Sequence, residues 1–257
     1  KKTKGNPIDG WLALDKPQGL TSSDAMNRVK RALRPRKIGH GGTLDPLASG
    51  LLPIALGEAT KTVAYVMDGV KAYRFTVRWG EGTDTCDAEG AVTATGETRP
   101  TEDEIAAVLE RFEGETMQTP PAYSAIKVNG QRAYDIARAG GDPGLEPRPV
   151  YLENLRLVAA EDADHATFEA VCGKGYYIRA LARDLGEALG TPAHLAALRR
   201  TRVSGLGEDD MISLDMVESN GHSPAVLDHV HPVAAALDDI PALALTETEA
   251  GRLRSGQ

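Results

Sequence analysis

The sequence predicts an α+β fold with a central mixed, largely antiparallel sheet that is flanked by helices and loops. Residues 73–79 alternate apolar and polar side chains, which is the period-two pattern of a half-buried strand. Asn129 and Gly130 form a dipeptide that is typical of a tight hairpin turn. A mixture of such hairpins with separated helical segments is typical of the α+β class.

Capping residues and breakers delimit the elements of the N-terminal part of the chain. Ser22 or Ser23 is expected to cap a helix that ends before Pro35. Thr101 and Glu104 form a capping box for a helix to about residue 112. The other segments expected here are a buried strand at 11–14, a Gly-rich loop at 38–50, apolar residues at 51–56, a short helix at 58–67, a turn region at 80–90 and a return strand at 91–95.

The middle of the chain is interrupted by Pro120-Pro121. Beyond this break we expect a strand at 123–128, a helical stretch at 131–139, a mobile Gly/Pro-rich loop at 141–149, strands at 150–159 and 166–172, and a helix at 177–189 that is closed by Gly190. The segment 208–257 is more acidic and has few strand signals, and its last residues, 245–257, are expected to open a further unit.

The composition predicts a cytoplasmic globular protein without a metal. Cys86 and Cys172 belong to no Cys-x-x-Cys pair and to no His/Cys cluster at zinc spacing, so we expect reduced thiols. No apolar run of about 18 residues occurs, and no apolar stretch follows residues 1–5. We therefore expect neither a membrane span nor a secretory signal.

Basic residues are concentrated in two places, although the net charge of −8 alone argues against nucleic-acid binding. Such runs usually form solvated helix faces. Because the first run leads directly into His40 and Asp45, contacts to nucleic-acid phosphates become a competing interpretation. The two groups are Arg28, Lys30, Arg31, Arg34, Arg36 and Lys37, and then Arg199, Arg200 and Arg202.

The Gly-rich segment 39–50 presents Asp45 between Leu44 and Pro46. Taken by itself, this pattern favours an ordinary turn with Asp as a turn former. A phosphate-binding loop would need the Gly-x-x-x-x-Gly-Lys-Ser/Thr pattern, which is absent. One Asp and one His are too few for a metal site.

Several motifs in a fixed order resemble one family. Residues 39–53, Gly-His-Gly-Gly-Thr-Leu-Asp-Pro-Leu-Ala-Ser-Gly-Leu-Leu-Pro, look like the catalytic motif of the bacterial tRNA pseudouridine-55 synthases of the TruB type. Further segments match the same family over roughly residues 8–205, namely 15–19, 57–61, 82–90, 118–125, 174–179 and 198–201. The resemblance implies the pseudouridine synthase catalytic fold and the isomerisation of uridine 55 in the T-arm of tRNA.

The resemblance also implies roles for individual residues. Asp45 is the expected nucleophile, Arg179 its arginine partner, and Tyr73 the active-site tyrosine that stacks on the uracil. His40 matches the residue that fills the gap left by an extruded base. The further expected substrate contacts are Lys16, Thr43, Tyr177, Leu198, Arg199 and Arg200; for Tyr177 and Leu198, core packing is an alternative role.

The same resemblance gives a domain organisation and a set of partners. A catalytic core at 1–205 is expected to contain a thumb-like RNA-contacting insertion at about 124–148, followed by an extension at 206–244. Residues 245–257 match only the possible start of a PUA-like appendage, which is expected to be truncated or reduced. The implied partner is the T-arm stem-loop of tRNA, bound by a monomer, and no cofactor or metal is implied because the reaction is redox-neutral.

Two other classes of function compete with the synthase. An RNA chaperone that refolds tRNA would bind it without chemistry, or this role would accompany catalysis. A glycoside hydrolase would need a second acid at a defined distance from Asp45, and the sequence names no clear partner. Asp84, Asp87 and Glu89 do not fit the spacing of an EF-hand, so an acidic turn is expected there.

Overall fold

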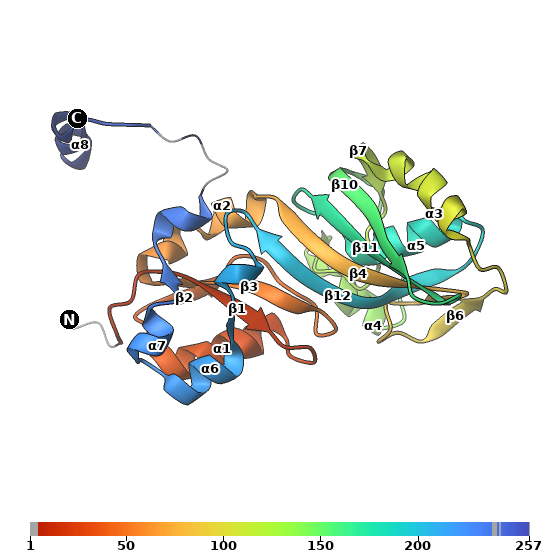
Figure 1. Cartoon of the computed structure of the whole chain (residues 1–257), viewed down its shortest axis with the longest axis horizontal. Coiled ribbons are helices and arrows are strands. Elements are labelled where there is room, and N and C mark those ends of the chain that lie inside the picture. Colours follow the sequence, from red (N-terminus) through yellow and green to blue (C-terminus); the bar gives the residue numbers. More distant parts are fainter. Residues whose placement is uncertain (1–4, 238–240, 242, 257) are drawn as a thin grey trace.

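The computed structural model describes residues 5–237, 241 and 243–256 (Figure 1). Its main feature is a ten-stranded mixed sheet with the order β13-β1-β3-β12-β4-β11-β10-β7, in which β14 pairs with β1 and β2 pairs with β3. The strands are β1 (Gly10–Lys16), β2 (Ile38–His40), β3 (Ser49–Leu56), β4 (Lys71–Trp79), β7 (Gly114–Gln118), β10 (Arg148–Ala160), β11 (His165–Cys172), β12 (Ala193–Val203), β13 (Ile212–Ser213) and β14 (Val230–His231).

Most neighbouring strands of this sheet run antiparallel. The exceptions among the described strands are β1 with β13 and β3 with β12, which are parallel pairs. Two small hairpins, β5 (Glu81–Thr83) with β6 (Val92–Thr95) and β8 (Lys127–Val128) with β9 (Gln131–Arg132), lie outside the main sheet. The predicted mixed, largely antiparallel sheet is therefore confirmed.

Helices gather at both ends of the sheet, as Figure 1 shows. The end formed by β1 and β3 carries α1 (Ser22–Leu33), α6 (Leu214–Asn220) and α7 (Pro224–Leu227), while α3 (Glu102–Leu109) and α5 (Ile178–Ala188) cover the part formed by β4, β10, β11 and β12. The remaining helices are α2 (Val63–Asp68), α4 (Ala133–Arg138), α8 (Glu247–Arg254) and the short 3-10 turns η1 (Gly57–Lys61), η2 (Glu110–Phe112), η3 (Glu208–Asp210) and η4 (Val233–Ala236).

Two large apolar cores meet in the middle of the sheet. One core joins α3 and α5 to the strands around Phe75 and Phe168, whose rings stack at 5.4 Å. The other joins α1 and α6 to β1 and β3. Tyr73 and Leu198 are half-buried and pack against both cores. Tyr73 and Leu198 therefore lie where the two cores meet. At this junction the sheet is accessible between the two parts that helices cover.

Two sequence predictions near the N-terminus are corrected by the structure. The N-cap of α1 is Thr21, whose hydroxyl accepts a hydrogen bond from the Asp24 amide, rather than Ser22 or Ser23. The segment 38–50 is not all loop, because β2 occupies its start and β3 begins at Ser49. The predicted capping box of Thr101 and Glu104 is confirmed.

Two further corrections concern strands. Of the strand predicted at 123–128, only Lys127 and Val128 form one. The preceding carbonyl groups accept hydrogen bonds from other partners: that of Tyr123 from Arg179 and that of Ser124 from the Tyr134 amide. Strand β12 was not predicted, because its polar residues show no apolar alternation, yet it lies between β3 and β4 in the sheet.

Candidate active site

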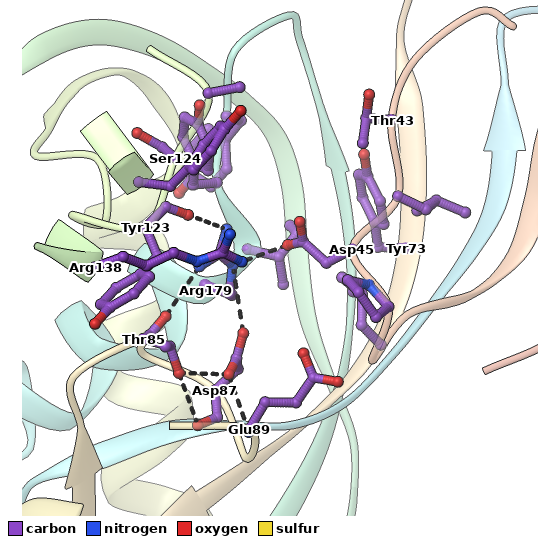
Figure 2. Close-up of a pocket in the computed structure, with 18 residues that line it drawn as sticks. Thr43, Asp45, Tyr73, Thr85, Asp87, Glu89, Tyr123, Ser124, Arg138 and Arg179 are labelled. Atoms are coloured by element: carbon purple, nitrogen blue, oxygen red, sulfur yellow. Dashed lines mark hydrogen bonds and ion pairs between the residues drawn. The ribbon is translucent and has the colours of Figure 1, made fainter. Parts of the chain in front are cut away.

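Asp45 lies on the loop between β2 and β3, at the mouth of a cavity of about 580 Å³. Its side chain is 40% exposed, and its Oδ2 lies 2.9 Å from Nε of Arg179 in an ion pair. Figure 2 shows the carboxylate between Arg179 on one side and Tyr73 on the other. The predicted partnership of Asp45 with Arg179 is thus present as a direct ion pair.

Arg179 comes from the first turn of α5, directly after the N-cap residue Tyr177 and Ile178. Its side chain is only 7% exposed and its guanidinium contacts three further groups (Figure 2). Nη1 donates to the carbonyl oxygen of Thr85 at 3.0 Å, Nη2 donates to that of Tyr123 at 2.9 Å, and Nε lies 3.7 Å from the Asp87 carboxylate. A planar guanidinium with five donors suits such a fork of acceptors, which fixes its orientation.

Tyr73 and three other predicted residues line the same cavity. Thr43 comes from the Asp45 loop, Tyr177 from the start of α5, and Leu198 from β12. Burial raises the pKa of the Tyr73 hydroxyl, against the opposing charge of Arg200. The phenol is therefore neutral at physiological pH and is available as a hydrogen-bond donor. Tyr177 also lies under the Arg148 guanidinium, whose carbon is 5.3 Å from the ring centroid.

Two of the residues predicted to contact substrate are buried and do not line the cavity. Lys16 is 0% exposed, and its ammonium donates to the carbonyl oxygens of Pro17 and Leu20. Arg200 is 1% exposed, and its guanidinium donates to backbone carbonyl oxygens. The structure therefore does not support direct contact of either side chain with RNA. Burial lowers the pKa of Lys16, while the charge of Asp45 opposes this shift.

The remaining two predicted residues, His40 and Arg199, do not line the cavity. Arg199 forms ion pairs with Asp15 at 3.0 Å and Glu208 at 2.8 Å, beside a second cavity of about 390 Å³. His40 is half-buried at the end of β2, and its Nδ1 has no hydrogen-bond partner among the described residues. Burial, assisted by the charge of Arg200, lowers the pKa of His40, so its ring is neutral at pH 7.

The sequence interpretation missed several lining residues. Glu89 is exposed at the cavity, and its pKa is raised first by desolvation and then by the charges of Asp87 and Asp45. Tyr134 and Arg138 lie in the RNA-contacting insertion predicted at about 124–148 but were not singled out; they reach the cavity from α4, and Arg138 lies 5.5 Å from the Tyr134 ring centroid. The acidic turn was recognised, but no local signal shows that it folds against Arg179, because that contact joins segments about 90 residues apart.

Comparisons with known proteins agree with this geometry. Residues 30–178 match the family model described as TruB family pseudouridylate synthase, N-terminal domain. Residues 179–238 match the model of the tRNA pseudouridylate synthase B C-terminal domain. The chain belongs to the TruB family of pseudouridylate synthases. It is accordingly a pseudouridine synthase, an enzyme of the isomerase class.

Relatives in the TruB family cover the whole chain. The chain is 58% identical to tRNA pseudouridine synthase B of Gluconacetobacter diazotrophicus, over 100% of this chain and 84% of the relative. It is 55% identical to the protein of the same name from Bradyrhizobium diazoefficiens, over 100% of this chain and 78% of the relative. The predicted family is therefore confirmed.

A solved structure confirms the fold of this TruB-family chain. A chain of a Cbf5–Nop10–Gar1 complex superposes with a TM-score of 0.76 at 27% identity, covering 100% of this chain and 74% of that one. The predicted pseudouridine synthase fold is thus correct. Within the described residues, no helix combines the length and apolar character that a membrane crossing requires.

Proposed function

We propose that this enzyme converts uridine 55 in the T-arm of tRNA to pseudouridine, with Asp45 as the nucleophile. The observation that carries the proposal is the ion pair of Asp45 with the buried Arg179, at a cavity that Tyr73 also lines. Relatives at 55–58% identity carry the name tRNA pseudouridine synthase B, which supports tRNA as the substrate. A related chain, 27% identical, is part of an H/ACA ribonucleoprotein solved with a substrate RNA containing 2'-deoxyuridine.

The chemistry needs a carboxylate whose charge and direction are fixed. Asp45 Oδ attacks either the uracil ring or C1′ of the ribose and forms an O–C bond there, and on both routes the N1–C1′ bond breaks. The uracil turns, a C5–C1′ bond forms, and the bond to Asp45 breaks so that the carboxylate is regenerated. C5 loses its proton and N1 gains one, so the product is an isomer. Arg179 holds one carboxylate oxygen, which leaves the other directed at the cavity. Such fixed geometry lowers the entropic cost of the attack.

Tyr73 is proposed to hold the uracil against this carboxylate. Its ring lines the cavity beside Asp45, and Leu198 and Tyr177 form other apolar parts of the wall. Aromatic faces stack well on bases. Because burial raises the pKa of its hydroxyl, Tyr73 acts on the base as a neutral phenol that donates a hydrogen bond.

RNA binding is proposed to use the basic run that precedes the Asp45 loop. Of its six basic residues, only Arg28 forms an ion pair among the residues that the structure describes, with Glu218. The others are exposed, namely Lys30, Arg31, Arg34, Arg36 and Lys37. Exposed cations that have no acidic partner are available to phosphates. His40 lies three residues after Lys37 and is proposed to fill the stack after the target base has flipped out.

The proposal is tested by mapping pseudouridine in unmodified tRNA after incubation with the protein, using a reagent that tags pseudouridine. We expect one new tag at position 55. A tRNA with cytidine at position 55 is the matched control and should remain untagged. Tags at another uridine would refute the T-arm assignment, while an absence of tags would refute the proposed substrate.

A tRNA-folding activity is proposed as a second function, because the proposed contacts of the exposed basic run with RNA do not require Asp45. If both functions exist, Asp45→Asn protein should accelerate refolding of tRNA as well as the wild type does. Loss of the acceleration together with the carboxylate would refute an independent chaperone role.

A further inference from the structure

The loop that carries Asp45 is fastened by a buried serine from another element. Ser22 lies in the first turn of α1 and is 2% exposed. Its Oγ accepts from the Leu44 amide at 2.8 Å and donates to the Leu44 carbonyl oxygen at 2.9 Å. Both backbone polar groups of the residue directly before Asp45 are therefore held by one hydroxyl, across 22 positions of sequence.

The helix itself does not need this hydroxyl. The N-cap of α1 is Thr21, and the Thr21 hydroxyl already accepts from the Asp24 amide at 3.0 Å. Serine has at best a neutral propensity for a helical position. The neighbouring Ser23, which has the same side chain, is exposed. The buried hydroxyl of Ser22 thus serves the Asp45 loop rather than the helix.

The residue after Asp45 is held from the same side. The Gly19 amide donates to the Pro46 carbonyl oxygen at 2.8 Å, so the segment 19–22 anchors the chain on both sides of Asp45. The Leu44 side chain is 4% exposed and packs in the same core as α1. These contacts fix the direction in which Cα–Cβ of Asp45 points.

Arg200 supports the more distant parts of the loop. Its Nη2 donates to the Gly42 carbonyl oxygen at 3.1 Å, and its Nε donates to that of Leu51 at 2.8 Å. Arg200 of β12 therefore holds Gly42 in the loop and Leu51 in β3, while Ser22 of α1 holds Leu44 next to Asp45. In contrast, the Asp45 carboxylate itself is 40% exposed and meets Arg179 as its ion-pair partner.

We propose that Ser22 is a positioning residue for the reaction, which sets the Asp45 carboxylate in reach of both Arg179 and the target nucleotide. This inference rests on the proposed role of Asp45 as nucleophile. Without the Ser22 hydroxyl, the Leu44 amide and carbonyl lose their partners in a buried place, and the loop shifts to satisfy them. A shift of about 1 Å at a reacting group can reduce a rate by about 10²-fold.

The test compares Ser22→Ala with Ser23→Ala, which removes an exposed hydroxyl one position away. Single-turnover pseudouridine formation is measured at saturating protein, with tRNA affinity measured separately, at a temperature where all proteins are folded. For Ser22→Ala we expect a rate on the order of 10- to 100-fold lower with an affinity within about twofold of wild type. Ser23→Ala should match the wild type in both.

A second variant and a second readout separate positioning from folding. Ser22→Cys keeps the shape of the side chain but is a weak donor and acceptor, so its rate should also fall. Hydrogen exchange of the peptide that spans 41–48 should increase in both Ser22 variants and stay unchanged in Ser23→Ala. Ser22→Thr, which keeps the hydroxyl, should recover most of the rate.

The outcomes separate this inference from the function on which it rests. If wild type is active and Asp45→Asn is not, but both Ser22→Ala and Ser22→Cys react at the wild-type rate, Ser22 is no positioning residue. An equal loss of tRNA affinity and rate would also overturn the inference. If Asp45→Asn retains full activity, the proposed nucleophile fails first and the inference fails with it.

Discussion

Arg179 connects three segments that lie far apart in the sequence. Its guanidinium contacts the carboxylate of Asp45 and the carbonyl oxygens of Thr85 and Tyr123. It also approaches the carboxylate of Asp87. The family resemblance predicted its pairing with Asp45 and the placement of Thr43 and Tyr73 at one cavity. It did not predict the other contacts of the guanidinium, because backbone acceptors leave no signature in a motif.

Replacing Arg179 with Lys tests whether catalysis requires the fixed directions of the guanidinium donors or only the positive charge. A lysine keeps the positive charge, but its single ammonium cannot reach Asp45, Thr85 and Tyr123 in fixed directions. We expect pseudouridine formation to fall by at least about 10²-fold, comparable to the loss of one oriented donor in other active sites. Single-turnover kinetics with tRNA would check this. A Lys174→Arg change at an exposed ion pair is a suitable control.

Lys71 gives a pH-dependent prediction, since burial and the nearby charge of Arg200 lower its pKa from 10.5 to about 8. Between these two pH values the unfolded chain binds the proton and the folded chain does not. The free energy of unfolding contributed by this group therefore rises with pH across that window and is flat below it. The full change is about 3.5 kcal/mol at most, from about 1.4 kcal/mol per pH unit between pH 8 and 10.5.

A Lys71→Met variant isolates this contribution. Chemical denaturation of wild type and variant at pH 7 and at pH 10 should show wild type gaining stability relative to the variant as pH rises. A difference in unfolding free energy that is the same at both pH values would show that Lys71 stays charged in the fold. Its donation to the Met67 carbonyl oxygen at 2.6 Å would then outweigh burial.

At the scale of elements, the sequence predicted the helices and strands that have a local residue pattern. It missed a strand whose position depends on pairing within the sheet. The alternation around Tyr73 and the capping box at Thr101 identified β4 and α3 correctly. Strand β12 has no such pattern, and its place in the sheet comes from pairing with β3 and β4, which are distant in sequence. The Arg200 guanidinium is buried where it donates to the carbonyl oxygens of Gly42 and Leu51, which its basic neighbours in sequence could not reveal.

The contact between β3 and β12 depends on Gly50. Its φ is +94°, and a Cβ at this position would lie 2.3 Å from the Arg200 carbonyl oxygen. We expect Gly50→Ala to destabilise the protein by at least about 2 kcal/mol, from the left-handed backbone and the clash together. Thermal unfolding would measure this loss of stability. Gly207→Ala is the control, because no atom lies within 4 Å of a Cβ added at Gly207. An unchanged melting temperature would contradict this packing.

At the scale of the whole molecule, the basic run forms a local group of cations. Lys30 and Arg31 lie in the last turn of α1, Arg34, Arg36 and Lys37 follow this helix, and all five residues are exposed. The net charge of −8 therefore conceals a group of exposed cations that precedes the Asp45 loop in the sequence. The sequence showed the clustering, but only the fold shows that these cations are exposed.

This group of exposed cations predicts a local effect on tRNA affinity. Replacing Arg36 or Lys37 with Gln should weaken binding and reduce the slope of log affinity against log salt by about 1 each, if each meets one phosphate. Arg111→Gln removes an exposed charge near α3 and should leave the slope unchanged. Equal slopes for all three variants would place the RNA elsewhere on the protein.

The most direct measurement for the whole account is pseudouridine formation by Asp45→Asn under single-turnover conditions, with tRNA binding measured in parallel. Asparagine keeps the size of the side chain but removes its charge and nucleophilic oxygen. We expect no detectable pseudouridine at position 55, while affinity for tRNA stays within about threefold of wild type, because the basic run is untouched. Product formed by this variant at the wild-type rate would contradict the role of Asp45 and, with it, the account of the site.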